Sequence, residues 1–307
     1  MSRPQSHRAQ LLVDCRNALG EMPVWEACSG TLHWVDVIAP GRVYQLDLAS
    51  MRVDFDEFVG LVTGIDLCAS GGLLMRTGQS IVHVDRARGM ETPIASLPDQ
   101  HMRFNDGHCD ANGRLWVGVM PNNIATDGSP VEIRDHTGYL MVVGDHEVRR
   151  IEAQMGCPNA ISWSPDGNIF YVADSCDGWL YQYAFDQAAG VISNRRPFAR
   201  FDDLGIPDGV AIDQEGYLWN ARWGAGAVAR ISPAGKLEEV VQIPAIQPTA
   251  CCFGGADLRT LFVTTARYGL SEAALAREPT AGGIFAIEID VPGAPMPAFH
   301  LESSGSH

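Results

Sequence analysis

Six segments of the chain repeat one another at nearly regular intervals. Each contains a short apolar run rich in branched or aromatic residues, and these runs begin at Leu32, Leu73, Leu115, Ile169, Leu218 and Leu261. The successive separations are 41, 42, 54, 49 and 43 residues, close to the period of about 40–50 residues of a β-propeller blade. Long apolar segments with helical periodicity are absent, which argues against an α/β fold. The repeat therefore predicts an all-β, six-bladed β-propeller.

The length of the chain suits one such propeller. We expect its 307 residues to form a single domain (residues 1–307), because a closed propeller exceeds the size of an average domain as one unit. The core is predicted to span about residues 12–295, between short flexible tails. Residues 11–16 are typical of a strand that closes the ring by joining the last blade, which removes an exposed sheet edge.

Three segments depart from the pattern of short strands. The polar segment Pro121–His136 accounts for the longest separation; it is either a loop over one mouth of the central channel, where a substrate is gripped, or a loop without function. Residues 271–277, with the sequence SEAALAR, predict one or two helical turns. The sequence GAGAVA at 224–229 matches a dinucleotide-binding pattern, but it lies between two strand-like runs, so we predict a hairpin turn.

The charge of the chain excludes one class of partner. The formal net charge is −15, the pI is near 4.9, and no run of Lys or Arg offsets the acidic residues, so nucleic acid would be repelled. The apolar runs are shorter than the about 20 residues of a membrane helix, and the N-terminal segment lacks the apolar stretch of a signal peptide. We expect no membrane partner, a cytoplasmic location, and eight cysteines that remain reduced.

One position of each repeat is expected to line the channel. It lies ten or eleven residues before each apolar run and is occupied by Glu21, Thr63, Asn105, Asn159, Asp208 and Cys251. The first strand of every propeller blade lines the central channel, so these positions converge although they are far apart in sequence. Four of the six carry a carboxylate or a carboxamide. For Cys251 we favour a small buried filler over a ligand, because a thiolate suits oxygen-rich neighbours poorly.

The four polar residues have two explanations. Asn and Asp beside Gly are ordinary turn formers that would cap each blade, but Glu21 is not a turn former. Two carboxylates at one point would repel each other and resist burial unless a cation joined them. We therefore predict one divalent metal ion at one end of the channel. All-oxygen ligation favours Ca²⁺, and Mg²⁺, Mn²⁺, Zn²⁺ and Fe²⁺ are also compatible with these ligands.

Arg103 lies two residues before Asn105 and therefore points to the same side of its strand. Its guanidinium can neutralise spare carboxylate charge, hydrogen-bond a polyhydroxylated ligand, or pair with a surface acid. The residues alone leave these roles open.

Four motifs occur in a characteristic order along the chain. They are LGEMPVWE with LHWVDV, RFNDGHCDANGRLWVGVM, CPNAISWSPDG and IPDGVAIDQEGYLW. Together with ARYGLSEAALAREPTAGGIFAIEI, they resemble the senescence marker protein/gluconolactonase/luciferin-regenerating enzyme (regucalcin-like) family over about residues 12–292, and the last motif resembles its sugar-lactonase members. The resemblance implies a six-bladed propeller that holds one divalent metal through Glu21, Asn159 and Asp208. It also implies that Arg103 and Asn105 contact the substrate.

The sequence departs from the family pattern at two places. Met22 stands where the usual motif has Gly after the ligand Glu21, which places a bulkier side chain beside that ligand. Animal members carry a substrate-contacting acidic residue after blade 3, whereas this chain has Asn122 and Asn123 there. We include Asn123 among the predicted substrate-binding residues.

The resemblance implies a metal-dependent lactonase that hydrolyses sugar lactones (aldono-lactones) to aldonic acids with metal-activated water. Asp208 is the implied catalytic base. Two other functions are compatible with the same residues: an aryl-esterase or phosphotriesterase that uses the same metal site, and a calcium-binding propeller without turnover. The expected partner is a small-molecule sugar lactone, and we expect a monomer or a weak homo-oligomer.

Overall fold

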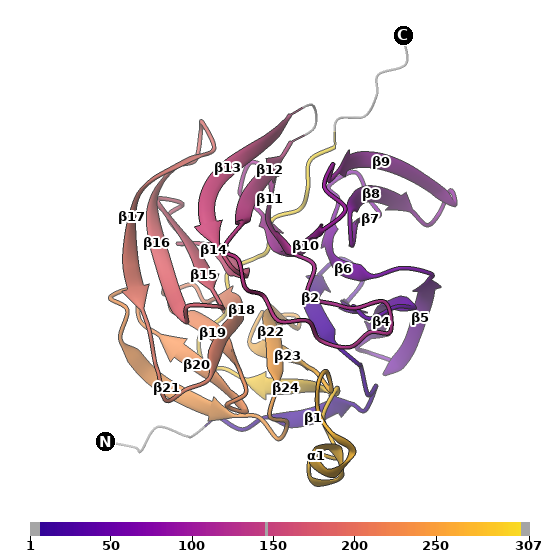
Figure 1. Cartoon of the computed structure of the whole chain (residues 1–307). Coiled ribbons are helices and arrows are strands. Elements are labelled where there is room, and N and C mark those ends of the chain that lie inside the picture. Colours follow the sequence, from indigo (N-terminus) through magenta and orange to yellow (C-terminus); the bar gives the residue numbers. More distant parts are fainter. Residues whose placement is uncertain (1–6, 145–146, 302–307) are drawn as a thin grey trace.

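The computed structural model describes residues 7–144 and 147–301, and its strands form six four-stranded sheets. The sheets stand around a central axis as the blades of a six-bladed propeller, which confirms the predicted fold (Figure 1). The predicted flexible tails include residues 1–6 and 302–307, which lie outside the described residues. No helix in the described part of the chain has the length and apolar character needed to cross a membrane.

The first three blades follow one another along the chain, each from its inner to its outer strand. Blade 1 consists of β2 (Gly20–Glu26), β3 (Thr31–Asp36), β4 (Gly41–Asp47) and β5 (Arg52–Phe58). Blade 2 consists of β6 (Val62–Leu67), β7 (Leu73–Thr77), β8 (Ser80–Asp85) and β9 (Met90–Ser96). Blade 3 consists of β10 (Met102–Cys109), β11 (Leu115–Pro121), β12 (Gly138–Val143) and β13 (Val148–Met155).

The other three blades repeat this order, except that the last one takes its outer strand from the N-terminal end of the chain. Blade 4 consists of β14 (Pro158–Trp163), β15 (Ile169–Asp174), β16 (Trp179–Asp186) and β17 (Val191–Ala199). Blade 5 consists of β18 (Ile206–Ile212), β19 (Leu218–Trp223), β20 (Ala227–Ile231) and β21 (Leu237–Gln242). Blade 6 consists of β22 (Pro248–Gly254), β23 (Thr260–Thr265), β24 (Ile284–Glu288) and β1 (Gln10–Val13).

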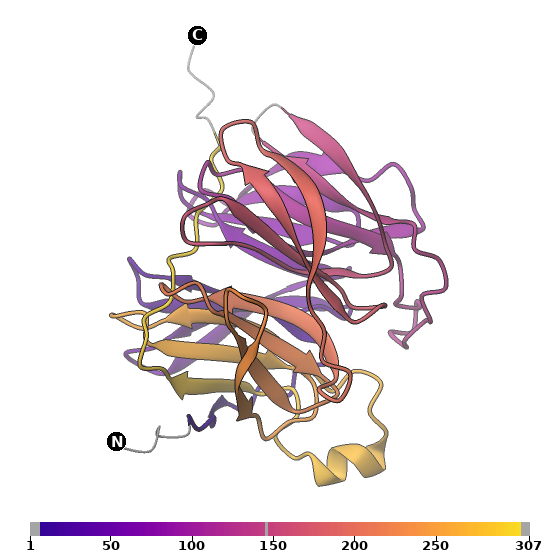
Figure 2. The same ribbon diagram turned by 90° about the vertical axis from the view of Figure 1, so that its left-hand side faces the viewer.

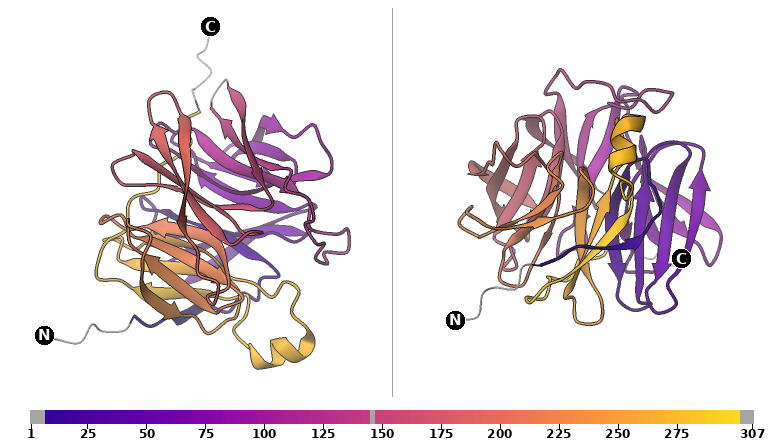
Figure 3. Two further views of the ribbon diagram at one scale, coloured as in Figure 1. Left: turned by 60° about the vertical axis from the view of Figure 1, so that its left-hand side comes forward. Right: turned by 90° about the horizontal axis from the view of Figure 1, so that it is seen from below.

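The two ends of the chain close the ring. β1 pairs antiparallel with β24, with Gln10 opposite Ala286 and Leu11 opposite Phe285, and the two strands lie side by side in Figure 3. The predicted closing strand at residues 11–16 is confirmed, although it begins earlier and ends at Val13. Because β1 continues directly toward blade 1, this pairing ties the first blade to the last.

An aspartate–tryptophan pair fixes the first hairpin of two blades. The Asp110 carboxylate accepts two backbone N–H groups of its own turn and the Nε1–H of Trp116 at 3.0 Å. The Asp213 carboxylate makes the same kinds of contact with its turn and with Trp219, again at 3.0 Å. Both tryptophans are fully buried. One carboxylate thus connects each turn to the core, and no polar group of the pair is left unsatisfied by burial.

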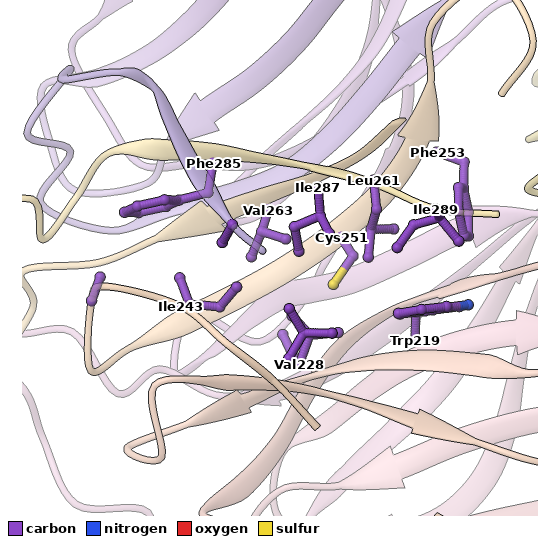
Figure 4. Packing of buried hydrophobic residues seen from close by; sticks show 14 residues of the cluster. Trp219, Val228, Ile243, Cys251, Phe253, Leu261, Val263, Phe285, Ile287 and Ile289 are labelled. Atoms are coloured by element: carbon purple, nitrogen blue, oxygen red, sulfur yellow. The ribbon is translucent and has the colours of Figure 1, made fainter. Parts of the chain in front are cut away.

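The apolar core lies between neighbouring blades. Figure 4 shows the cluster between blades 5 and 6, where Trp219 and Val228 face Cys251, Leu261 and Ile287. These side chains come from strands whose apolar residues alternate with residues that face the other side of the sheet. Burial of each such side chain contributes about 1.5–3 kcal/mol, and the shared clusters hold the six sheets in one ring.

Different segments cover the two faces of the ring. The predicted mouth loop at 121–136 crosses the centre of one face (Figure 1), and the short predicted helix, α1 (Glu272–Arg277), projects from the same face (Figure 2). The C-terminal segment crosses the opposite face: the N–H of Ala294 donates to Ile212 O at 2.8 Å, and the N–H of His300 donates to Gly113 O at 2.9 Å.

The predicted hairpin at 224–229 is confirmed. It is the turn between β19 and β20, and Gly224 and Gly226 adopt φ values of 80° and 58° there. These left-handed conformations are readily available only to glycine. The glycines of this sequence therefore serve a tight turn, and no helix follows them to bind a dinucleotide.

Phe299 anchors the C-terminal segment between blades 2 and 3. Its side chain is fully buried among apolar residues of both blades, and its N–H donates to Leu67 O at 2.8 Å. We expect Phe299→Ala to lower the free energy of unfolding by about 3–5 kcal/mol, because it removes a buried ring and leaves a cavity. Denaturant titration measures this loss. Phe55→Ala, at a residue that is 52% exposed, is the control, and an equal loss in both variants would contradict the anchoring role.

Candidate functional site

A cavity of about 370 Å³ opens on the face that carries α1 and the mouth loop. Its walls come from the inner strands of blades 1 to 5, from the mouth loop and from the segment before α1. The cavity brings together every residue that the sequence places in the site: Glu21, Arg103, Asn105, Asn123, Asn159 and Asp208. The predicted convergence of distant residues at one end of the channel is thereby confirmed.

A β-bulge lies at the cavity position of every inner strand. The regular pairing is interrupted after Glu21 and Asn159, and around Thr63, Asn105 and Asp208. A bulge turns a side chain away from the alternation of the strand and bends the backbone. Six bulges at the same level therefore direct six side chains toward the axis, and five of them belong to the predicted channel positions.

In blade 6 the predicted channel residue is wrong. The bulge in this blade lies between Pro248 and Ala250, so Thr249 takes the position that we assigned to Cys251. Thr249 Oγ1 donates to Gly20 O at 2.5 Å, next to Glu21. Cys251 packs instead in the core between blades 5 and 6 and lines a separate cavity on the opposite face. Its predicted role as a buried filler is confirmed.

The error arises from the length of one turn. In blade 5, Ile212 pairs with Leu218, whereas the matching pair in blade 6 is Phe253 with Leu261. The connection in blade 6 is therefore two residues longer. Counting a fixed ten residues back from Leu261 therefore stops at Cys251, two residues short of Thr249.

Two aspartates fix the backbone that leads to the site residues. The carboxylate of Asp36 accepts the N–H groups of Ala18 and Leu19 at 2.9 and 2.8 Å, just before Glu21. In blade 4, Asp174 makes the matching contacts with the N–H groups of Gly156 and Cys157 at 2.8 and 2.9 Å, just before Asn159. Each clamp uses a charge-assisted pair of hydrogen bonds, which holds the start of the inner strand in place.

A chain of hydrogen bonds connects blades 3, 4 and 5 across the floor of the cavity. Arg103 Nη1 donates to Asn105 Oδ1 at 2.8 Å, and Asn105 Nδ2 donates to Asn159 Oδ1 at 2.9 Å. Asn159 Nδ2 donates to Ser175 Oγ at 2.8 Å, and this hydroxyl donates to Pro207 O at 2.7 Å. The chain fixes both carboxamide orientations and ends at the residue before Asp208. Asn105 thus links the guanidinium to Asn159 as well as lining the cavity.

Blade 5 supports Asp208 from behind. Asn220 Nδ2 donates to the backbone oxygens of Asp208 and Gly209 at 2.6 and 3.2 Å. Arg222 Nη1 donates to Asn220 Oδ1 at 3.0 Å, and its Nε donates to Leu204 O at 2.7 Å. Both supporting side chains are fully buried. The carboxylate of Asp208 is therefore carried on a rigid part of the strand.

Arg103 is held by neutral groups. Its Nε and Nη2 donate to Asn123 Oδ1 at 3.0 and 2.7 Å, and its Nη1 donates to Phe104 O at 2.9 Å. The side chain is only 5% exposed, and burial lowers the pKa of the guanidinium below its ordinary value. The surface ion pair that was one of the open roles for Arg103 is therefore wrong. Tyr268 secures the same wall, because its hydroxyl donates to Asn123 O at 3.2 Å.

Two carboxylates line the same cavity, and of these Asp208 is buried and Glu21 is half-buried. The pKa of Glu21 is raised to about 8, mainly by burial and in addition by the nearby Asp106 carboxylate. The N–H of Met22 and the charge of Arg103 lower it by smaller amounts. Burial also raises the pKa of Asp208 well above its usual range, with contributions from Glu21 and Asp106. In the metal-free protein, both groups therefore resist ionisation.

These residues fit a divalent cation. Asp208 is buried and Glu21 is half-buried, and within the described chain the Arg103 guanidinium directs its hydrogen bonds to carboxamide and carbonyl oxygens and not to these carboxylates. Glu21, Asp208 and Asn159 together offer only oxygen ligands, which suit a hard ion such as Ca²⁺. In residues 7–144 and 147–301, including the cavity, no group of three or more His, Cys, Asp or Glu side chains has a metal-binding arrangement, so the candidate set depends on the carboxamide of Asn159 as its third ligand.

Several cavity residues were missed by the sequence analysis. Asp106 follows Asn105, and simple alternation would send its side chain away from the channel, but the bulge brings it to the cavity wall, where one oxygen accepts the N–H of Ile161 at 2.9 Å. Ser175 and Tyr268 follow the second strands of blades 4 and 6, and their contacts with other blades depend on the closed ring. Met22 carries a left-handed φ of 49° beside Glu21, a conformation that costs a residue with Cβ on the order of 1 kcal/mol.

The fold and the cavity define a class of protein: a six-bladed propeller with carboxylates and carboxamides gathered at one end of its channel. Residues 19–267 match the family described as SMP-30/Gluconolactonase/LRE-like region. The chain belongs to this family, as the motifs of the sequence indicated.

Similar proteins span nearly the whole chain. Regucalcin from Oryctolagus cuniculus is 36% identical over 286 residues, which cover 90% of this chain and 93% of that protein. The 6-deoxy-6-sulfogluconolactonase from Pseudomonas putida is 33% identical over 289 residues, which cover 92% of this chain and 95% of that protein. The crystal structure of the calcium-binding protein regucalcin from Agrobacterium tumefaciens has a TM-score of 0.89 and 28% identity, with coverage of 98% and 100%.

The raised pKa of Glu21 predicts a pH dependence of stability in the metal-free protein. Between its ordinary pKa of 4.5 and the folded value of about 8, the folded state keeps a proton that the unfolded state releases, so stability falls as pH rises. We expect the Tm of chelator-treated protein to fall between about pH 5 and about pH 8, a range that lies within that window. Glu21→Gln should reduce this fall in Tm and should raise the free energy of unfolding by on the order of 1–3 kcal/mol at the upper pH.

The exposed Glu91 provides the control for this measurement. Glu91→Gln should leave the pH dependence of Tm as it is in the wild-type protein. If Glu21→Gln behaves like Glu91→Gln, the Glu21 carboxylate is not the source of the pH dependence.

Proposed function

We propose that this protein hydrolyses sugar lactones to the corresponding aldonic acids with the help of one divalent metal ion. The observation that carries the proposal is the cavity itself, where two desolvated carboxylates, a buried guanidinium and orienting carboxamides converge. The similarity to a lactonase from Pseudomonas putida supports the reaction class. The similarity to a calcium-binding regucalcin supports a metal, with calcium as the first candidate.

Glu21, Asn159 and Asp208 would hold the metal. Their combination leaves room for other ligands, as is usual for catalytic and not for closed structural sites. When bound, the ion supplies positive charge that polarises the lactone carbonyl and favours ionisation of water. It also compensates the two carboxylates whose burial is otherwise unfavourable.

The residues of the chain itself orient the substrate and move the proton. Arg103 and Asn123 bind ring substituents, and the fixed Asn105 keeps Arg103 in place, so the lactone is held in one orientation. Asp208 takes a proton from the water whose oxygen forms the new bond to the carbonyl carbon. The ester C–O bond then breaks, and the ring oxygen leaves as a hydroxyl after accepting a proton. Asp208, whose pKa is raised in the metal-free protein, would be ionised when a cation is bound, and its oxygen that does not bind the metal would then take the proton.

The mouth loop limits access of water from the open face. Val131 and Ile133 of this loop form part of the cavity wall beside Asn123. Apolar side chains there exclude bulk water around the bound substrate, which strengthens the charge interactions inside. The same cavity is compatible with an aryl-esterase or phosphotriesterase, and these substrates belong in the first activity screen.

Metal content and lactone turnover test the proposal together. We expect purified wild-type protein, after chelation and addition of Ca²⁺, Mn²⁺ or Zn²⁺, to bind one ion per chain and to acidify solutions of aldono-lactones. Asn159→Ala and Asp208→Ala should each lose bound metal and activity because each removes one ligand, and Glu21→Gln should bind metal more weakly because it removes the charge of one ligand. Full metal stoichiometry in all three variants would contradict the proposed metal site. Bound metal without turnover of any lactone or ester would support the calcium-binding alternative.

Asp208→Asn separates the ligand role from the base role. The substitution keeps an oxygen and nearly the same shape but removes the basic carboxylate. If Asp208 is the base, kcat at saturating metal should fall by about 10²–10⁴-fold, and the corresponding limb of the pH–rate profile should vanish. Steady-state kinetics across pH at saturating metal measure both effects. Recovery of most of kcat under these conditions would assign the proton transfer to another group.

A further inference from the structure

Arg103 is a buried cation that forms no ion pair with a carboxylate of the described residues. It is the one basic side chain among the described residues that line the cavity, and it is 5% exposed. Four of its N–H contacts go to neutral oxygens: two to Asn123 Oδ1, one to Phe104 O and one to Asn105 Oδ1. Burial of a charge is costly unless an opposite charge compensates it. Glu21 and Asp208 act on this charge only through space, and no carboxylate of the described chain forms a hydrogen bond with the guanidinium.

The guanidinium also determines how Asn123 faces the cavity. Because two donors of Arg103 bind Asn123 Oδ1 at 3.0 and 2.7 Å, the carboxamide oxygen must point toward the guanidinium. Its Nδ2 then points away, and within the described chain it has no hydrogen-bond partner. Tyr268 binds the backbone oxygen of the same residue, so the wall has little freedom to turn. This side of the cavity therefore offers N–H donors and positive charge.

Such a wall suits a negatively charged oxygen group. An anion would accept from Asn123 Nδ2 and would be attracted by the positive charge of the Arg103 guanidinium behind it, and such charge-assisted bonds are stronger than those to a neutral hydroxyl. A carboxylate at position 123 would do the opposite: it would neutralise Arg103 and present an acceptor, which suits the hydroxyl of a neutral sugar. The choice of Asn here thus changes both the charge and the donor pattern of the wall.

We propose that the preferred substrate is a sugar lactone that carries a second, anionic group, which Arg103 and Asn123 bind. The inference rests on the proposed lactonase function and specifies its substrate class. The hydrogen-bond chain places the proposed anion-binding wall relative to the metal ligands. Arg103 binds Asn105 at 2.8 Å, and Asn105 binds Asn159 at 2.9 Å. The anion-binding wall is therefore one side chain away from the predicted metal ligand, and the cavity of about 370 Å³ lies in the range of small-molecule sites.

The first experiment compares lactones of different charge. Initial rates are measured for the metal-loaded protein with neutral gluconolactone, with glucarolactone, which carries a free carboxylate, and with 6-phosphogluconolactone. We expect kcat/KM to be about 10–100-fold higher for at least one anionic lactone, as a charge-assisted hydrogen bond to a buried partner warrants. The two anionic substrates show whether a carboxylate or a phosphate fits the wall.

Asn123→Asp tests the wall with almost no change in shape. The new carboxylate keeps the contact with Arg103 but neutralises it and replaces the inward donor by an acceptor. The preference for anionic lactones should disappear or reverse. Asn122→Asp is the matched control, because Asn122 bonds to the backbone of Ile124 at 3.1 and 3.2 Å and does not line the cavity. This variant adds the same charge one residue away and should keep the wild-type preference.

A binding measurement separates this inference from the proposed reaction. Calorimetric titration of each protein with gluconate and glucarate compares one carboxylate with two, without any turnover. Tighter binding of glucarate to wild-type and Asn122→Asp protein, but not to Asn123→Asp, supports the anionic class even if no lactone is hydrolysed. Equal binding of both acids in all three proteins overturns it. Efficient hydrolysis of gluconolactone, with a substrate ratio that Asn123→Asp does not change, also overturns it and leaves the lactonase function standing.

Discussion

The site depends on the desolvation of two like charges at one point. Glu21 and Asp208 belong to blades 1 and 5, and Glu21 raises the pKa of Asp208 in addition to the effect of burial. Folding alone would not favour this arrangement, because buried carboxylates are stable only when neutral or compensated. The clamps of Asp36 and Asp174 and the support of Asn220 hold the backbone around them. The rigid ring thus maintains an arrangement that local forces oppose, as is typical of functional sites.

Much of this architecture follows from the sequence because a propeller repeats one local rule. The strand spacing predicts six blades, and the first strand of each blade must face the axis, so Glu21, Asn159 and Asp208 converge without knowledge of any contact. The predicted hairpin at 224–229 and the helix near residue 272 depend on local preferences and are also confirmed. These features need no information about neighbouring blades.

The errors and omissions of the sequence analysis arise where a bulge or a neighbouring blade determines the direction or the contacts of a side chain. Cys251 was assigned to the axis by counting, but a longer turn shifts the register and leaves Thr249 there. Asp106 reaches the cavity only because the bulge in β10 interrupts the alternation. The partners of Arg103 could not be read from its strand, since Asn123 lies in a long loop and Tyr268 in another blade. The desolvation of Glu21, which raises the pKa of its carboxyl group, likewise depends on the complete ring.

The pairing of β1 with β24 has a consequence for biosynthesis. β1 leaves the ribosome first, whereas its partner, Ile284–Glu288, is among the last segments to appear. The nascent chain can complete five blades before the sixth has its outer strand, and contacts between such distant segments form slowly because of the entropy of closing a long loop. Until then an unpaired strand edge is exposed, which favours association with other chains. Yield during expression should therefore be most sensitive to changes at this seam.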